Sequence, residues 1–281
     1  MRHPILARYI DAIHRRCSGS RHLVSLALKV RNQANAVIRA RMADGIRANA
    51  NGEQLLIDVV APQARSFIDV GANVGAWTQA FSKKCARPAW GCLFEPSPNA
   101  HATLLHAVED ICRDDTLSLE VLCQALGDAP GEIPFYAEPN AGETSSFVFG
   151  HSARSATRIM VPVGTLDTEL AKRSIEKVDM VKIDAEGFDC KVLRGATEAM
   201  SRQALGVIQF EYNGPWALAG DTLYAAIGLA SRSGYETFLL KNDGLFRFDW
   251  KRYGEFFGYS NFIAVSPPWL ATLMPIVVGD I

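Results

Sequence analysis

The sequence has few of the patterns that mark metal-bound, disulfide-linked or membrane-spanning proteins. Its six cysteines form no C-x-x-C pair, and the histidines do not cluster with them in the spacing of a zinc site. Scattered cysteines in a chain of 281 residues are typical of reduced thiols in a core. We therefore expect a cytoplasmic protein without a structural zinc site.

Long apolar runs and a strong net charge are also missing. The longest apolar tract, FIAVSPPWLATLMPIVV, contains three prolines and falls short of a membrane span. The first residues, MRHPILARYIDAIHRR, are too broken by charge to form a signal peptide. A net charge of −1 gives no reason to expect nucleic acid as the main partner. We therefore expect neither a membrane span nor nucleic-acid binding.

What the chain does contain is an ordinary globular composition, 48% hydrophobic and 21% charged, with enough residues for a sizeable core. Residues 1–50 are rich in Arg, Ala and Leu at roughly helical spacing, which predicts an N-terminal helical extension. A solvated amphipathic extension is the favoured interpretation, and a membrane-surface or partner-binding role is the alternative. The small polar break ANANGEQ (48–54) predicts a boundary with one domain over residues 51–281.

From residue 51 onward, strand-like and helix-like segments alternate. Five strand–helix units are predicted, and their strands are SFIDV, WGCLFEP, LSLEVLCQAL, VDMVKIDAEG and LGVIQFEYN. This order predicts an α/β fold with a parallel sheet covered on both faces. Short β-like pieces between residues 131 and 163 predict a small antiparallel insertion. A hairpin through Asp243-Gly244 and a last strand, YSNFIAVSP, predict an antiparallel strand at one edge of the sheet.

Ligands of such sheets bind at the carboxyl ends of the strands, and the first strand end carries FIDVGANVGAW (67–77). Gly71 permits a tight turn, and Gly75 permits close approach of the following helix. In a dinucleotide-binding loop a second glycine would stand where this chain has Asn73. Asp69 would repel a pyrophosphate but suits a ligand with an ammonium group, such as S-adenosylmethionine. No lysine follows the glycines, which excludes a P-loop.

Two further strand ends fit a nucleoside ligand. Glu95 closes the second strand about 20 residues beyond the loop, where an acid accepts both ribose hydroxyls. Pro96 then ends the strand and turns the chain outward. In CQALGD, after the third strand, Gln124 can hydrogen-bond to an adenine edge while Ala125 packs against its face. A plain β-turn is an equally consistent interpretation of CQALGD.

The fourth strand end, VKIDAEGFD, combines a lysine with carboxylates. Lys182 and Asp184 point to one side of the strand, and a lysine within a parallel strand needs a charged partner. Gln209 and Glu211 share a face of the next strand, so the four side chains are predicted to form one polar cluster. The alternative is an ion-pair network that only orders two loops. Trp77 is interpreted as a packing residue rather than an aromatic that faces a sulfonium.

Together these motifs resemble the FkbM-type family of S-adenosylmethionine-dependent methyltransferases. The matching stretches run in the family's order across roughly residues 51–265: FIDVGANVG, LFEPSP, QALGD with GEIPFY, TSS, VPVGTLD, VDMVKIDAEG, VLRGA and IQFEYN. The resemblance implies a Rossmann-like class I methyltransferase fold with a mostly parallel seven-stranded sheet. It also implies methyl transfer, commonly to a hydroxyl oxygen of a sugar or natural product. Ala185 and Asp189 depart mildly from the family's usual larger aliphatic residue and glutamate.

The resemblance also assigns roles by position. The residues around the cofactor, S-adenosyl-L-methionine, would be Asp69, Gly71, Ala72, Asn73, Gly75, Glu95, Pro96, Gln124 and Ala125, with Asp184 at the transfer site. We expect Asp184 to be the general base, Glu211 to be the second choice, and Lys182 to hold the carboxylates in place. Coordination of Mg²⁺ by two carboxylates is the lesser alternative, so no metal ligand is assigned.

The expected partner is a small-molecule or glycan acceptor, selected by residues 131–163 and by the N-terminal helices. Two other classes of function share the fold. An NAD-dependent oxidoreductase would keep the ribose acid, but Asp69 and Asn73 count against it. A non-catalytic accessory domain is the other, and intact Asp69, Glu95 and Asp184 argue against decay of the site.

Overall fold

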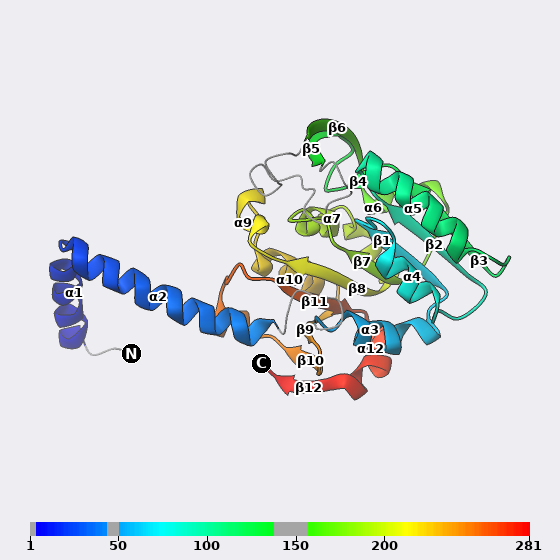
Figure 1. Ribbon diagram of the computed structural model, residues 1–281. Coiled ribbons are helices and arrows are strands. Elements are labelled where there is room, and N and C mark those ends of the chain that lie inside the picture. The colour runs from blue at the N-terminus through cyan, green and yellow to red at the C-terminus, as the bar shows by residue number, and fades with distance from the viewer. Residues whose placement is uncertain (1–3, 44–50, 138–156) are drawn as a thin grey trace. The chain divides into compact units, whose positions relative to one another are not determined.

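The computed structural model describes residues 4–43, 51–137 and 157–281 of the chain (Figure 1). The chain forms two compact units, Met1–Arg41 and Met42–Ile281. No helix in the described ranges has both the length and the apolar character needed to cross a membrane. The boundary predicted at residues 50 and 51 adjoins residues 44–50, which are outside the described ranges, and it stays a prediction.

The first unit is built from helices α1 (Pro4–Ser18) and α2 (Arg21–Met42). The two helices are separated by Gly19 and Ser20, and the backbone N–H of Ser20 donates to the carbonyl oxygen of Cys17 at 3.1 Å. The helical character predicted for this extension is thus present in the described residues 4–42, as two helices rather than one stretch without a stated break.

The second unit contains a nine-stranded sheet in the order β12-β10-β9-β11-β8-β7-β1-β2-β3. Five neighbouring strands run parallel: β3 (Leu117–Leu122), β2 (Ala89–Phe94), β1 (Ser66–Val70), β7 (Val178–Ile183) and β8 (Leu205–Tyr212). They are the five strands that the sequence predicts. The other four are β11 (Ser260–Val265), β9 (Glu236–Lys241), β10 (Gly244–Arg247) and β12 (Val277–Asp280).

The α/β class and the mostly parallel sheet are confirmed, and two details of the sheet differ from expectation. The sheet has nine strands rather than seven, and the antiparallel strand β11 lies inside it, between β8 and β9. All six residues of β11 are buried, as an interior position requires. The hairpin through Asp243-Gly244 joins β9 to β10 as predicted, and β12, which the sequence did not reveal, forms the edge beyond β10.

Helices cover both faces of this sheet. One group comprises α3 (Glu53–Val60), the short 3-10 helix η2 (Ala61–Gln63), α4 (Ala76–Ser82), α5 (Pro98–Ile111), α12 (Pro267–Leu273) and η3 (Met274–Ile276). A second group comprises α6 (Leu166–Lys172), α7 (Asp189–Arg194), α8 (Thr197–Ser201) and α10 (Leu223–Arg232). Two short helices, α9 (Pro215–Ala219) and α11 (Trp250–Tyr253), lie in connections that the sequence pattern left unassigned.

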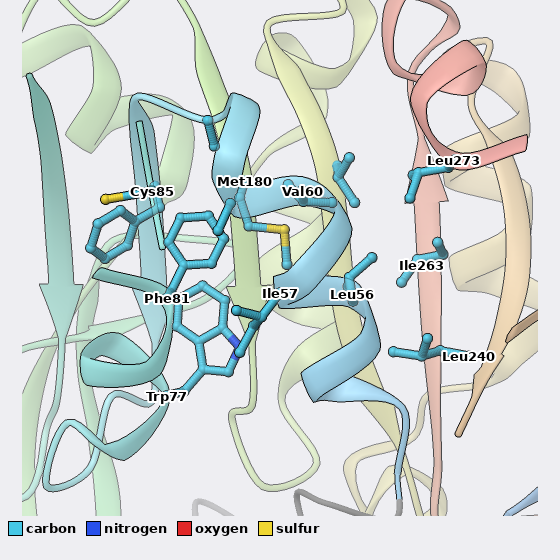
Figure 2. Packing of buried hydrophobic residues seen from close by; sticks show 14 of the residues in the cluster. Leu56, Ile57, Val60, Trp77, Phe81, Cys85, Met180, Leu240, Ile263 and Leu273 are labelled. Atoms are coloured by element: carbon cyan, nitrogen blue, oxygen red, sulfur yellow. The ribbon is translucent and has the colours of Figure 1, made fainter. Parts of the chain in front are cut away.

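The main core lies between the first group of helices and the sheet. Leu56, Ile57 and Val60 of α3 point onto the strands, beside Trp77 and Phe81 of α4 (Figure 2). Trp77 stacks on Phe81, with ring centroids 4.9 Å apart and planes 17° apart. Trp77 therefore packs in this core, as interpreted from the sequence, and it also lines the pocket described below.

A second, three-stranded sheet has the order β4-β6-β5. Its strands are β4 (Ala125–Leu126), β5 (Gly131–Ala137) and β6 (Thr157–Gly164), and β5 pairs antiparallel with β6 as predicted for the insertion. The strand predicted over LSLEVLCQAL extends too far, because it covers β3 of the large sheet and also β4, which belongs to this second sheet. The TSS motif (144–146) lies outside the described residues.

The second helix group begins at a side-chain cap and contains one short break. Thr165 is the N-cap of α6, and its hydroxyl accepts from the backbone N–H of Thr168 at 3.1 Å. The stretch CKVLRGATEAMS is not one continuous helix, because Gly195 and Ala196 separate α7 from α8. A Cβ at Gly195 would lie 2.0 Å from the carbonyl oxygen of Gly127, so a larger residue does not fit at this break.

Candidate functional site

The loop between β1 and α4 is held tightly by the loops beside it. Gly71 has φ +76°, and a Cβ there would lie 1.9 Å from the carbonyl oxygen of Asp184. The N–H groups of Gly71 and Ala72 donate to the carbonyl oxygen of Phe94 at 2.9 and 3.1 Å. The absence of a side chain at position 71 therefore brings three strand ends together.

Gly75 serves a different neighbour from the one expected. It has φ +85° and is the N-cap of α4, but a Cβ there would lie 2.8 Å from Cδ1 of Leu104. Leu104 belongs to α5, so Gly75 permits close packing of α5 rather than of the helix that directly follows the loop. Asn73 adopts φ +49°, a left-handed conformation that asparagine tolerates better than most residues.

Glu95 at the end of β2 is fastened to the glycine loop. Its Oε2 accepts from the N–H of Asn73 at 2.8 Å, and its Oε1 accepts from the N–H of Ser97 at 2.7 Å. Burial raises the pKa of Glu95 to about 7, although these two backbone hydrogen bonds lower it. Each oxygen keeps a lone pair for a further donor, as recognition of a ribose diol requires.

Asp69 lies below the loop rather than in the wall that a ligand would touch. Its side chain is fully buried, and its Oδ2 accepts from the hydroxyl of Thr78 at 2.6 Å. Its Oδ1 lies 3.8 Å from Nζ of Lys182. Burial raises the pKa of Asp69, whereas Lys182 and Thr78 lower it. The carboxylate of Asp69 thus contacts Lys182, which lines the pocket, and does not line the pocket itself.

Lys182 of β7 joins Asp69 to the residue that follows its own strand. Its Nζ lies 3.1 Å from Oδ2 of Asp184, and the residue is only 5% exposed. Although burial lowers it, the carboxylates of Asp184 and Asp69 hold the pKa of Lys182 above its usual value. The expected charged partner exists, but it comes from β1 and from the end of β7, not from the next strand.

The expected four-residue cluster is only partly assembled. Gln209 of β8 is opposite Lys182 in the sheet, as predicted, but its amide donates to Oε1 of Glu53 at 2.8 Å. Glu211 remains near Asp184, and its Oε1 accepts from the amide of Asn213 at 2.5 Å.

Glu211 lies in an acidic environment. Burial raises its pKa well above the usual value, and the negative charges of Asp184, Asp189 and Glu186 raise it further. Asp189 is fully buried, and its carboxylate accepts from the N–H groups of Gly187 and Glu211 at 3.3 and 3.2 Å. Burial, and then Asp184, raise the pKa of Asp189 to about 8. Asp189, which stands where the resemblance leads us to expect glutamate, therefore links the loop after β7 to β8.

A pocket of about 1100 Å³ opens at the carboxyl ends of β1, β2, β7 and β8. Of the residues expected from the sequence, those that line it are Gly71, Ala72, Asn73, Glu95, Pro96, Gln124, Ala125, Lys182, Asp184 and Glu211. Asp69 and Gly75 lie outside this lining.

The side chain of Gln124 lies beside that of Glu169. Burial raises the pKa of Glu169, but hydrogen bonds from Lys172, Gln124 and Arg173 bring this pKa below its usual value.

Sequence reasoning missed one wall of this pocket. Asn51, Glu53 and Tyr259 line it, and the amide of Asn51 donates to the hydroxyl of Tyr259 at 2.9 Å. Asn51 falls in the small polar break that marked a boundary, and the only signal it carries is its side-chain chemistry. Tyr259 directly precedes β11 and reaches the pocket because β11 lies next to β8.

Comparison with known families gives a clear result. The family model described as the methyltransferase FkbM domain matches residues 69–236, which is more than half of the chain. This chain belongs to the FkbM methyltransferase family. The resemblance noted from the motifs is thereby confirmed, and with it an S-adenosylmethionine-dependent methyltransferase. A family of methyltransferases gives no support to the oxidoreductase alternative.

Among solved structures, the chain is similar to an O-methyltransferase from Bacillus cereus in complex with SAH (13% identity, 85% of this chain and 90% of that chain covered, TM-score 0.39). It is also similar to Aeropyrum pernix fibrillarin with natively bound S-adenosyl-L-methionine (12% identity, 76% and 73% covered, TM-score 0.42). A third is the precorrin-6y C5,15-methyltransferase from Geobacter metallireducens (10% identity, 76% and 87% covered, TM-score 0.40). No curated protein matches the chain.

The lining of the pocket fits S-adenosylmethionine. Glu95 has a buried carboxylate, which suits a ribose diol, and the buried Oδ1 of Asn73 has no hydrogen-bond partner among the described residues. Lys182 is the only Lys or Arg in the described lining, and it already contacts two carboxylates. A lining so poor in cations suits a cofactor that carries an ammonium and a sulfonium but no phosphate. No group of three or more His, Cys, Asp or Glu residues with the geometry of a metal site occurs in the described part of the chain.

Proposed function

We propose that this methyltransferase transfers a methyl group to a hydroxyl oxygen of a sugar or natural product, with Asp184 as the general base. The observation that carries the proposal is the position of Asp184. Its carbonyl oxygen packs against Gly71 of the cofactor loop, while its carboxylate contacts Lys182 and lines the pocket. A carboxylate at this point adjoins both the cofactor loop and the space left for an acceptor.

When bound, the cofactor supplies an activated methyl group on a sulfonium, so the protein must align the acceptor and remove its proton. Alignment of two reactants is worth about 7–11 kcal/mol, and a general base adds roughly 10²–10⁴-fold. Asp184 accepts the proton of the acceptor hydroxyl, and the ammonium of Lys182, 3.1 Å away, orients the carboxylate. Nζ of Lys182 also lies 3.8 Å from Oδ1 of Asp69, which helps to fix its position.

Glu211 has a different role in this proposal. Burial and the negative charges of Asp184, Asp189 and Glu186 raise its pKa well above the usual value. Its Oε1 already accepts a hydrogen bond from the amide of Asn213 at 2.5 Å, whereas the carboxylate of Asp184 contacts the ammonium of Lys182. In this proposal Glu211 therefore positions an acceptor oxygen together with Asn213, and Asp184 is the base.

The cofactor-binding residues are proposed as they were predicted, with two changes of role. Glu95 binds the ribose, Asn73 accepts from the ammonium group, and Gln124 and Ala125 border the adenine. Asp69 acts through Lys182 rather than by direct contact, and Gly75 shapes the loop. Residues 51–281 form the methyltransferase domain, residues 131–163 take part in selecting the acceptor, and the protein works in the cytoplasm.

The decisive experiment compares Asp184→Asn with wild type. S-adenosylhomocysteine binding measured by calorimetry should stay within about threefold, because the backbone contacts of residue 184 do not depend on the carboxylate. Turnover of sugars and polyols with a labelled methyl donor should fall by roughly 10²–10⁴-fold. Asp243→Asn, in an exposed hairpin turn, is the matched control and should keep both properties.

Three results would count against the proposal. Wild-type turnover by Asp184→Asn would show that residue 184 is not the general base. Methylation at a carbon or nitrogen atom of the acceptor, located by mass spectrometry of the product, would show that the acceptor atom is not a hydroxyl oxygen. Cofactor binding by the wild type without turnover of any acceptor favours the non-catalytic accessory domain.

A further inference from the structure

Positive charge is concentrated in the first unit of the chain. Met1–Arg41 contains nine Lys or Arg residues and one acidic residue, Asp11, which gives a formal charge of +8. The other 240 residues contain 20 basic and 29 acidic residues, a formal charge of −9. The near-neutral total therefore conceals two units of opposite sign.

Helix α2 combines this charge with an exposed apolar stripe. Leu23, Leu26, Val30 and Val37 are spaced by three, four and seven residues, so they lie on one side of the helix. These side chains are 46%, 57%, 62% and 71% exposed. The stripe therefore extends over most of a helix about 33 Å long and is largely open to water.

The charged residues of α2 are of one sign, and two further apolar residues, Val24 and Leu28, lie outside the stripe at 40% and 43% exposed. The helix contains five basic residues and no Asp or Glu. Lys29 and Arg31 fall on the two borders of the stripe, where long basic side chains reach a charged surface while the apolar residues beside them are buried. Helix α1 adds exposed Tyr9 and Ile13, four residues apart.

This combination favours one class of partner. A second copy of the chain that paired its stripe with this one would bury both stripes but would bring two units of charge +8 together, with one acidic residue in each to compensate. Nucleic acid would match the charge but would leave the Leu and Val side chains exposed to water. An anionic lipid surface matches both, because its headgroups attract the basic residues and its acyl region takes the stripe.

We infer that residues 1–42 bind the surface of a membrane containing anionic lipids, with α2 lying in the plane of the interface. Leu23, Leu26, Val30 and Val37 enter the acyl boundary, and Lys29 and Arg31 contact headgroup phosphates. This binding holds the methyltransferase at a membrane surface without a transmembrane segment. It does not depend on the identity of the methyl acceptor.

The test uses the full-length protein and co-sedimentation with vesicles. Vesicles of phosphatidylcholine with phosphatidylglycerol should bind the protein at least about tenfold more strongly than vesicles of phosphatidylcholine alone. Added salt should weaken the binding. The triple variant Leu26→Ser, Val30→Ser, Val37→Ser should lose on the order of tenfold or more in partitioning, because it removes the apolar contacts.

Matched controls separate this effect from unfolding. Asn32→Ser with Asn35→Ser changes the opposite side of α2 and should leave vesicle binding unchanged. All variants should keep the wild-type affinity for S-adenosylhomocysteine, so a failure of lipid binding is distinguishable from a failure of the methyltransferase assignment. The inference is overturned if anionic vesicles do not bind the protein, if the triple variant binds as well as wild type, or if neutral vesicles bind equally. It is also overturned if the stripe instead mediates self-association, seen by light scattering as a mass that falls in the triple variant.

Discussion

Replacing Lys182 by methionine should destabilise the protein by about 3–5 kcal/mol, the usual cost of removing one partner from a buried ion pair. Methionine has a similar length and keeps the packing of the alkyl chain, so the change removes mainly the charge. Lys182 is 5% exposed and Asp69 is fully buried, so water cannot replace the lost ammonium. Thr78 alone then faces the carboxylate of Asp69, through one hydrogen bond of 2.6 Å.

The cost should depend on pH with a definite sign. Burial already raises the pKa of Asp69, and Lys182 lowers it, so the Lys182→Met variant raises it further. A carboxyl group whose pKa is raised on folding contributes stability below its unfolded pKa and loses it as pH rises through the folded pKa. The variant should therefore be close to wild type near pH 4 and show most of the loss of about 3–5 kcal/mol at neutral and higher pH.

Urea unfolding followed by tryptophan fluorescence measures this difference at several pH values. Lys177→Met, at an exposed position, is the control and should stay within about 0.5 kcal/mol of wild type. The double variant Asp69→Asn, Lys182→Met should lose less than the sum of the single variants, by roughly 0.5–3 kcal/mol. A pH-independent loss together with strict additivity would refute the ion-pair argument.

Three further predictions address the loop, the ribose acid and a helix cap. Gly71→Ala should lower the free energy of unfolding by more than the roughly 1–2 kcal/mol that a left-handed alanine costs, because its Cβ would lie 1.9 Å from the carbonyl oxygen of Asp184. Urea unfolding measures this loss, and Gly131→Ala, which has open space around it, is the control. The affinity for S-adenosylhomocysteine should fall as pH drops through about 7, because Glu95 then takes a proton, and Glu95→Gln should bind weakly at every pH; calorimetry showing the same pH dependence in both proteins would exclude this role. Thr165→Ala should lose about 1 kcal/mol in urea unfolding and Thr165→Ser much less, and equal losses would mean that the cap hydroxyl contributes nothing.

The central strands were predictable because each is a short apolar run that is buried on both faces. β1 is buried at all five of its positions, so SFIDV stands out from the polar segments around it. β12 has no such signature, since its residues alternate between exposed and half-buried. Its place in the sheet comes from pairing with β10, and a weak local pattern does not reveal a pairing partner.

Breaks inside elements were predicted less well than the elements themselves. CKVLRGATEAMS has good helical spacing, but it is interrupted at Gly195, which packs against the backbone of the loop at Gly127. LSLEVLCQAL has good strand character, but the chain passes from one sheet to another between Leu122 and Ala125. In both cases the decisive neighbour lies far away in the sequence or in a different sheet.

The sequence by itself determined the chemistry of the site: a glycine loop with no phosphate-binding lysine, an acid at the next strand end, and a lysine two residues before Asp184. These features survive in the structure because each depends on residues within a few positions of one another. Only the tertiary structure decided how they are joined. It placed Asp69 behind Lys182, turned Gln209 toward Glu53, 156 residues away, and closed one wall with Tyr259. The physical reason is that periodicity reports which face of a strand is buried, whereas the partner of a buried polar group is set by the packing of distant segments.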